Sequence, residues 1–338
     1  MAEYCGSNKR CTHGEQMKKA IVQLGIDPAT YPEGAVALVE QLASDYEVRV
    51  MTDRDEIRRH LDRIEIAFVR FPHDLLPEAQ ALKWLQQGGA GADWLSSHPQ
   101  VRELPFTLTS ASGVHAVPIS EHMLGFLLAL GRAFPQAIRG QKQRIWDGNR
   151  EHELFELAGK RVLILGVGAI GERFATLCQA CEMEVVGLRR DPALGAKGVS
   201  RMVGHNALRD ELSAADVVAN TLPYTEQTHH FIGEQEFACM KDGVILINIG
   251  RGGTIEEPAM IAALRSGKLR AAGLDVFETE PLPEGSPLWE MENVLLTPHY
   301  SGLTPRYNER LFEIFIDNLR RFQNGAELRN VVDKRLGY

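Results

Sequence analysis

Short apolar runs alternate along this chain with longer segments in which apolar residues recur every three or four positions. The runs have the length and composition of buried strands, and the recurring pattern is typical of helices that pack on a sheet. Alternation of this kind predicts βαβ units with parallel strands. In the first third of the chain we expect strands at 20–24, 47–51, 64–69 and 106–109, and helices at 34–44 and 77–84.

A second and stronger series of the same kind follows residue 118. It begins with a long helix at 119–132, and several of its strands are almost continuously apolar, as in sheets that are covered on both faces. The strands are expected at 161–165, 184–188, 216–219, 244–249, 271–276 and 294–296. A final helix, expected at 305–323, carries one apolar stripe formed by Leu311, Phe315, Leu319 and Phe322.

The first series has too few strands to close after Thr109, so we expect the final helix to return to it. The pattern therefore predicts an α/β protein of two Rossmann-like or flavodoxin-like domains with parallel sheets. The expected outer domain is discontinuous and consists of 1–116 and 301–338, and the expected inner domain spans 117–300. Residues 1–18 are polar and aperiodic and are interpreted as a loose arm.

The composition agrees with two compact globular domains. Of the 338 residues, 44% are apolar and 24% are charged. The formal net charge of −8 argues against nucleic acid or an anionic membrane surface as a partner. No secretory leader or membrane-length apolar run is evident, and five scattered cysteines favour a cytoplasmic location. Cys178 and Cys181 are interpreted as packed thiols, and no metal is expected.

A glycine-rich turn, Gly166-Val-Gly168-Ala-Ile-Gly171, follows the strand at 161–165 and opens a helix expected at 172–180. In such a turn the first glycine permits the sharp bend, the second lets the backbone approach a pyrophosphate, and the third allows close packing of helix and strand. The N-terminus of the helix favours the anion. Glycine-rich turns are common, but this context predicts a dinucleotide site rather than a purely structural turn.

The end of the second strand indicates which dinucleotide is bound. NAD sites usually carry an acidic residue there, about 20 residues after the turn, which accepts hydrogen bonds from the ribose hydroxyls. This chain has Arg189 and Arg190 instead, and guanidinium groups at this point can hold a 2′-phosphate. Asp191 comes next, where we expect it to face solvent. NADP(H) is therefore favoured, and NAD(H) remains possible if both arginines belong to a solvated loop.

Polar segments follow each of the last three strands, and they contain Arg251, Glu280 and His299. Because open parallel sheets bind ligands beyond the carboxyl ends of their strands, these segments should converge on one crevice beside the cofactor. A positioned acid and a cation suit the reduction of a ketone, in which negative charge develops on oxygen. Each residue alone could be structural, as a salt bridge, a solvated carboxylate or a turn residue. Together they favour catalysis.

The glycine turn, Gly250-Arg251-Gly252, Asp275-Val-Phe-Glu-Thr-Glu280-Pro281 and Thr297-Pro-His299 resemble, in order and approximate spacing, the D-isomer specific 2-hydroxyacid dehydrogenases. Segments 85–93 and 112–122 are also similar to the substrate loop and interdomain helix of that family. The resemblance extends from residue 19 to the C-terminus. It implies that 117–300 is the dinucleotide-binding domain, that 1–116 with 301–338 is the substrate domain, and that the active site lies in the cleft between them. His115 and His122 in the second segment are interpreted as surface or capping residues.

The resemblance implies a role for each matching residue. Arg251 would bind the substrate carboxylate and polarise the keto oxygen, and His299 would protonate that oxygen. Glu280 would orient His299 through a hydrogen bond. The implied substrate ligands are Ala90, Gly91 and Arg251. The implied dinucleotide ligands are Gly166, Gly168, Ala169, Ile170, Gly171, Arg189, Arg190, Leu222, Pro223 and Asp275, the last at the nicotinamide amide.

The predicted function is the NADPH-dependent reduction of a small 2-keto acid, such as glyoxylate or hydroxypyruvate, to a D-2-hydroxy acid. The resemblance also implies a homodimer formed through the helix at 119–132. Alternatives are a corepressor-like, nucleotide-dependent binding protein and a dehydrogenase of another small anion such as phosphite. Formate is disfavoured because relatives that act on it carry glutamine where Glu280 stands. A phosphoglycerate dehydrogenase with an appended regulatory domain is not expected, since the chain ends soon after the final helix.

Overall fold

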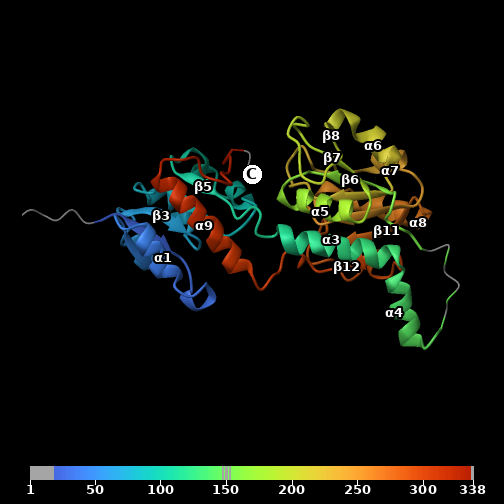
Figure 1. Ribbon diagram of the computed structural model, residues 1–338, viewed down its shortest axis with the longest axis horizontal. Coiled ribbons are helices and arrows are strands. Elements are labelled where there is room, and N and C mark those ends of the chain that lie inside the picture. The colour runs from blue at the N-terminus through green and yellow to red at the C-terminus, as the bar shows by residue number, and fades with distance from the viewer. Residues whose placement is uncertain (1–18, 147, 149–150, 152–153, 336–338) are drawn as a thin grey trace, which may run out of the picture. The chain divides into compact units, whose positions relative to one another are not determined.

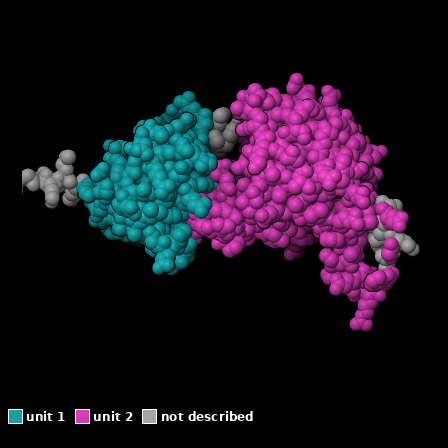
Figure 2. All heavy atoms as spheres, in the orientation of Figure 1, with its two compact units in different colours: residues 1–111, 311–338 teal, residues 112–310 magenta. Residues whose placement is uncertain are grey.

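The computed structural model describes residues 19–146, 148, 151 and 154–335. Contacts within the chain divide it into two units, one formed by residues 1–111 and 311–338 and the other by residues 112–310 (Figure 2). Each unit contains its own parallel sheet, so the prediction of an α/β fold with two parallel sheets is confirmed. The arm interpreted at 1–18 lies outside the described residues.

In the described part of the first unit, five parallel strands pair in the order β2-β1-β3-β4-β5 (Figure 1). The strands are β1 (Ile21–Leu24), β2 (Glu47–Val50), β3 (Ile64–Phe68), β4 (Trp84–Gln86) and β5 (Thr107–Thr109). The helical elements are α1 (Ala35–Leu42), α2 (Arg54–Arg58) and the 3₁₀ turns η1 (Pro28–Thr30), η2 (His73–Glu78), η3 (Asp93–Ser96) and η4 (Pro99–Glu103). The four strands predicted here and the helix predicted at 34–44 are confirmed.

The last helix, α9 (Tyr307–Gln323), packs against this first sheet. Phe315 stacks on Phe68 of β3, with ring centroids 4.2 Å apart, and on Trp84 of β4 at 5.3 Å. Leu311 and Leu319 on the same stripe are also buried. The apolar stripe read from the sequence is therefore the face that α9 buries on the first unit.

The helix predicted at 77–84 is wrong. The 3₁₀ turn η2 ends at Glu78, and β4 begins at Trp84. Pro77 has no backbone N–H and does not support a continuing α-helix. Trp84 is fully buried in the sheet, where its indole N–H donates to Thr109 Oγ1 at 2.8 Å. The three residues of β4 are too few to show a hydrophobic period in the sequence. They form a strand because they pair with β3 and β5.

In the described part of residues 112–310, seven parallel strands pair in the order β12-β11-β10-β9-β6-β7-β8. The strands are β6 (Arg161–Leu165), β7 (Glu184–Leu188), β8 (Arg201–Val203), β9 (Val217–Asn220), β10 (Val244–Asn248), β11 (Leu269–Leu274) and β12 (Val294–Leu296). The order reverses between β6 and β9, which is the point where open sheets of this type bind ligands. The six strands predicted here are confirmed, and β8 was missed.

Helices cover both faces of the second sheet. They are α3 (Ala116–Gly131), α5 (Ala169–Ala180), α6 (Leu208–Ala214), α7 (Glu234–Cys239) and α8 (Glu257–Ser266). The helix α4 (Phe134–Gln143) follows α3, and the 3₁₀ turns are η6 (His205–Ala207), η7 (Gly252–Thr254) and η8 (Pro287–Trp289). Val162 and Ile164 of β6 pack with α3 and α5, whereas Leu163 and Leu165 pack with α6, α7 and α8. This alternation explains the continuous apolar runs, because both faces of each central strand are buried.

Two helices begin earlier than the pattern predicted. α3 begins at Ala116 rather than 119, and α5 begins at Ala169 rather than 172. The helix α4 was not predicted, and Figures 1 and 2 show it extending away from the rest of the second unit. No helix among the described residues is both long and apolar enough to cross a membrane.

Candidate active site

The glycine turn joins β6 to α5 and is closely packed. Gly166 has φ of +86°, and a side chain there would also meet Leu222, whose backbone lies 3.3 Å from the ideal Cβ position. A Cβ at Gly171 would lie 2.7 Å from the Gly166 carbonyl oxygen. Both positions therefore require glycine. The predicted residue Leu222, at the end of β9, lies directly beside the turn.

The N-terminus of α5 is suited to an anion. Gly168 is the N-cap residue, no side chain caps the helix, and a Cβ at Gly168 would meet nothing within 4 Å. Gly168 and Ala169 are exposed. The first N–H groups of a helix carry partial positive charge and seek an acceptor. The open backbone at Gly168, between two glycines that pack tightly, fits the pyrophosphate of a dinucleotide.

Arg189 and Arg190 follow β7 directly and lie next to the glycine turn. The Gly166 N–H donates to the carbonyl oxygen of Leu188 at 3.0 Å, so the residue before Arg189 is fixed to the turn. Arg189 is half-buried and Arg190 is exposed. Asp191 is exposed too, and its carboxylate accepts from the Ala193 N–H at 3.0 Å within its own turn. The position that is acidic in NAD sites is thus occupied by arginine.

The loop that carries Arg251 packs directly on the segment that carries Glu280. A Cβ at Gly252 would lie only 1.9 Å from the carbonyl carbon of Phe277, so the two backbones touch at this point. Arg251 itself follows β10, and its Nη1 donates to the Gly250 carbonyl oxygen at 2.9 Å. The neighbouring strand β11 leads into Phe277 and Glu280. The register of β10 and β11 therefore places both segments at one edge of the sheet.

Glu280 and His299 form a hydrogen bond of 2.6 Å between Oε2 and Nδ1. The other carboxylate oxygen of Glu280 accepts from the Phe277 N–H at 3.0 Å, which fixes the orientation of the group. A carboxylate in this position accepts, so Nδ1 of His299 carries the proton and Nε2 remains for exchange with a substrate. The imidazole is half exposed, at 50% of its side-chain area. This arrangement suits a general acid with an orienting carboxylate.

Asp275 is fully buried behind this pair. Its Oδ1 accepts from Thr297 Oγ1 at 2.5 Å and from the Tyr300 N–H at 3.1 Å, and its Oδ2 accepts from the Ser301 N–H at 3.1 Å. Its carbonyl oxygen accepts from the His299 N–H at 2.9 Å. Asp275 therefore binds the whole turn that carries His299. Its contact with a nicotinamide amide stays a prediction.

The turn needs this support because His299 adopts a left-handed backbone conformation, with φ of +51°. That conformation costs roughly 1–2 kcal/mol for a residue with a side chain. Sequence reasoning missed the anchoring role of Asp275. The available signal was a carboxylate directly after a buried apolar strand, which must have several hydrogen-bond partners.

The other predicted substrate residues, Ala90 and Gly91, lie in the first unit after β4. Gln87 Nε2 donates to the carbonyl oxygens of Gly89 and Gly91, at 3.0 and 2.8 Å, and this side chain holds the loop. The Trp94 indole N–H in turn donates to Gln87 Oε1 at 2.8 Å. A cavity of about 150 Å³ opens beside the loop. Its lining includes Arg70, His73, Gln87, Gly91 and Trp94.

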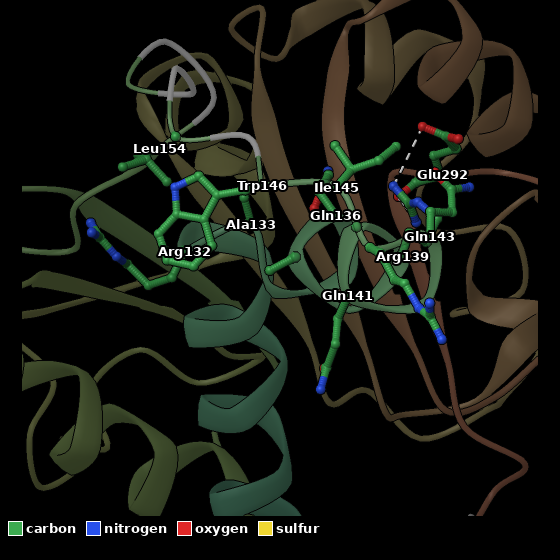
Figure 3. Close-up of a pocket in the computed structure, with 14 residues that line it drawn as sticks. Arg132, Ala133, Gln136, Arg139, Gln141, Gln143, Ile145, Trp146, Leu154 and Glu292 are labelled. Atoms are coloured by element: carbon green, nitrogen blue, oxygen red, sulfur yellow. Dashed lines mark hydrogen bonds and ion pairs between the residues drawn. The ribbon is translucent and has the colours of Figure 1, made fainter.

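A larger cavity of about 790 Å³ lies beside α4, and Figure 3 shows it. None of the predicted site residues lines it. Arg139 on α4 forms an ion pair across it with Glu292, at 3.4 Å between Nη2 and Oε2. Trp146, which follows the helix, also contributes to its wall. This cavity belongs to the surface around α4 rather than to the residues that follow β10, β11 and β12.

The cysteine pair in α5 forms no metal centre in the described structure. Cys178 is buried, and that burial raises the pKa of its thiol. Cys181 is partly buried at the end of the helix. No group of three or more potential metal-ligating side chains occurs among the residues that the structure describes.

Comparison with known proteins identifies the family. The family model described as D-isomer specific 2-hydroxyacid dehydrogenase, NAD binding domain, matches residues 124–301, more than half of the 338 residues. The chain belongs to this family. The match contains the glycine turn, Arg251, Glu280 and His299, so the resemblance read from the motifs is confirmed.

Two curated relatives differ in the substrates that their names state. A glyoxylate reductase of Aeropyrum pernix is 33% identical over 79% of this chain and 81% of its own length. A D-3-phosphoglycerate dehydrogenase of Archaeoglobus fulgidus is 30% identical over 89% of this chain. The chain spans only 57% of the length of that phosphoglycerate dehydrogenase.

A solved structure shares the fold over almost the whole chain. It is the NADPH-dependent glyoxylate/hydroxypyruvate reductase of Sinorhizobium meliloti, in complex with NADP and sulfate. The TM-score is 0.72 at 28% identity, and the alignment covers 95% of this chain and all of that one.

Proposed function

We propose that this protein is an oxidoreductase that transfers a hydride between NADP(H) and a small 2-keto or 2-hydroxy acid. The observation that carries the proposal is the hydrogen bond between His299 Nδ1 and Glu280 Oε2 on the sheet that also carries the glycine turn. An imidazole with one nitrogen held by a carboxylate and the other left for exchange is equipped to protonate an oxygen. Residues 117–300 would form the dinucleotide-binding domain, and 1–116 with 301–338 the substrate domain.

Each site residue has a separate role in the proposed reaction of the substrate. A bound dinucleotide would supply a hydride to the carbonyl carbon, and His299 would donate the proton from Nε2 to the carbonyl oxygen. Glu280 stabilises the charged imidazole before that transfer. Arg251 binds the substrate carboxylate through two parallel hydrogen bonds and polarises the carbonyl oxygen. The N–H groups of Ala90 and Gly91 add donors to the carboxylate.

The preference for NADP(H) rests on Arg189 and Arg190. Two guanidinium groups directly after β7 can pair with a 2′-phosphate, and Asp191 is engaged in its own turn. The name of the Sinorhizobium meliloti reductase states NADPH dependence, which supports the same choice here. The glycine turn, with Ala169, Ile170, Leu222 and Pro223, would bind the rest of the dinucleotide, and Asp275 the nicotinamide amide.

Glyoxylate and hydroxypyruvate are the proposed substrates. The name of the Aeropyrum pernix relative and that of the Sinorhizobium meliloti structure support them. The name of the phosphoglycerate dehydrogenase relative makes 3-phosphohydroxypyruvate a second candidate substrate. Arg70, which lines the cavity beside Gly91, is a cation that would serve either anion.

A second copy of the chain is the proposed partner, with α3 and α4 as the contact. Large apolar side chains around α4 are more than half exposed. They are Phe134, Ile138, Ile145 and Trp146, the last at 99% exposure. Such a cluster on a projecting helix is typical of an interface. Sedimentation of the full chain, compared with Ile138→Asp, tests this: a monomeric wild type would contradict it.

Turnover measurements test the proposed activity. The full chain is assayed for NADPH and NADH oxidation with glyoxylate, hydroxypyruvate, pyruvate and 3-phosphohydroxypyruvate, and for reduction of NADP with phosphite. We expect steady oxidation of NADPH with one of the small 2-keto acids. Tight dinucleotide binding without turnover on any of them would favour the corepressor-like alternative. Turnover with phosphite alone would favour an enzyme of another anion.

A further inference from the structure

A chain of hydrogen bonds connects helix α3 to the turn that carries His299. His122 on α3 lies 3.1 Å from Thr297, between Nε2 and Oγ1. Thr297 Oγ1 lies 2.5 Å from Oδ1 of Asp275. The same carboxylate binds the Tyr300 and Ser301 N–H groups. His122 and Thr297 are 175 residues apart in sequence, and the packing of α3 on the sheet brings them together.

The direction of each hydrogen bond follows from the donors available. The Asp275 carboxylate accepts from backbone N–H groups, and it accepts the hydroxyl proton of Thr297 as well. A hydroxyl has one proton, so its oxygen is then free to accept, and His122 is the donor through Nε2–H. Burial lowers the pKa of His122, and the nearby Asp275 carboxylate only partly opposes that effect. His122 can donate from Nε2 in the neutral state.

Ring packing also holds His122 against the same turn. Its imidazole lies edge-on to Phe126 of α3, with centroids 4.5 Å apart, and perpendicular to Tyr300 at 5.6 Å. Tyr300 follows His299 directly. His122 therefore contacts both ends of the turn, Thr297 through a hydrogen bond and Tyr300 through ring contact. The sequence interpretation of His122 as a surface or capping residue does not describe these contacts.

We infer that His122 is a positioning residue for the general acid: through the Thr297 hydroxyl it fixes the Asp275 carboxylate, and thereby the left-handed turn that presents His299. The inference rests on the proposed function, because it concerns the same site. Loss of this series of hydrogen bonds leaves His299 and Glu280 present but less well placed relative to the substrate carbonyl. Arg251 lies on another loop, so substrate carboxylate binding changes less. Removing these hydrogen bonds should therefore lower kcat more than it raises KM.

Paired variants separate the hydrogen bond from mere packing. His122→Leu and Thr297→Val remove the donor and the hydroxyl, whereas His122→Gln and Thr297→Ser retain them. A small displacement of a reacting group can cost about a hundredfold in rate, so we expect kcat to fall about 10- to 100-fold in the first pair. The second pair should keep kcat within about threefold of the wild type. KM for the keto acid should change little throughout.

A matched control and a double variant complete the kinetic test. Thr176→Val removes a hydroxyl that bonds only within α5, to the Glu172 carbonyl oxygen, and should leave kcat unchanged. The double variant His122→Leu with Thr297→Val should lose no more kcat than the less active single variant, because both substitutions break the same series of hydrogen bonds. Losses of kcat that multiply in the double variant would overturn the inference. Equal losses of kcat in His122→Leu and His122→Gln would overturn it as well.

Hydrogen exchange gives a readout that does not depend on turnover. In His122→Leu and Thr297→Val, the amides of 299–301 should exchange at least about tenfold faster, while those of α8 keep their wild-type rates. Wild-type exchange in this turn would contradict the positioning role even in an active enzyme. Faster exchange in a protein that reduces no keto acid would support the hydrogen-bond chain and refute the proposed function instead.

Discussion

Nδ1 of His299 and Oε2 of Glu280 are 2.6 Å apart, although 19 residues separate them in sequence. Glu280 cannot rotate freely, because its other oxygen accepts from the Phe277 N–H. His299 in turn is fixed by its own N–H, which donates to the Asp275 carbonyl oxygen. Both side chains are thus held in place by the backbone of the segment that follows β11.

His299→Gln removes the proton donor and should lower kcat by about 10²–10⁴-fold. Glu280→Gln retains a hydrogen-bond acceptor but removes the charge, so it should lose less activity than Glu280→Ala. Steady-state kinetics with NADPH and the preferred keto acid measure all three. The Kd for NADPH, from fluorescence titration, should stay close to the wild type. A wild-type kcat for His299→Gln would rule out its role as the acid.

Arg251→Ala should damage both kcat and KM for the keto acid. A hydrogen bond to a charged group contributes about 1.5–3 kcal/mol, so kcat/KM should fall about 10- to 150-fold for one bond and further for two. Arg251→Lys keeps the charge without the planar fork and should recover only part of the loss. An unchanged kcat/KM in Arg251→Ala would show that another residue binds the carboxylate.

Replacing Arg189 and Arg190 with alanine should raise the KM for NADPH about tenfold or more, through loss of charge-assisted hydrogen bonds to a 2′-phosphate. The KM for NADH should hardly change. Arg209→Ala on α6, where the side chain bonds Gln235, is the control for loss of an exposed cation elsewhere in the same unit. An equal increase in the KM for NADPH and for NADH would contradict the proposed preference for NADP(H).

Gly252→Ala should both destabilise the protein and reduce activity. Its Cβ would overlap the Phe277 carbonyl, 1.9 Å away, so the Arg251 loop must separate from the Glu280 segment. Overpacking of this kind costs about 1–3 kcal/mol or more in the free energy of unfolding. Gly285→Ala adds the same methyl group where nothing lies within 4 Å and serves as the control. Thermal unfolding and kcat/KM are measured for both, and equal Tm values would contradict the close packing.

Asp216 should contribute a pH-dependent part of the stability. Burial raises the pKa of its carboxyl, but hydrogen bonds from the Arg161 N–H and from Lys241 Nζ outweigh that and hold the pKa below 3.8. A pKa lowered on folding stabilises the protein above the unfolded value, and the contribution is lost as pH falls through the folded value.

Asp216→Asn should therefore be less stable than the wild type at pH 7, by about 1 kcal/mol. The difference should shrink below pH 4, where the carboxylate of the unfolded wild type begins to take up a proton while that of the folded protein stays ionised. Urea unfolding at pH 7 and pH 3.5 measures it. A difference that stays the same at both values would show that charge at Asp216 plays no part.

The sequence by itself determined the features that depend on local pattern. Continuous apolar runs identified the strands around β6 and β10, because side chains on both faces of a covered sheet are apolar. The glycine turn and the order of Arg251, Glu280 and His299 could also be recognised in the sequence, since each motif lies within a few residues of a strand end. These motifs were sufficient to identify the family.

Tertiary structure decided which elements became neighbours. Residues 77–84 became a 3₁₀ turn and a strand only because β3 and β5 were present to pair with β4. Asp275 anchors the His299 turn because β11 and β12 are neighbours in the sheet, and His122 bonds Thr297 because α3 packs on the sheet beside β11. These contacts join residues far beyond one helical turn or one strand period, 175 positions apart for His122 and Thr297, so no local period or spacing records them.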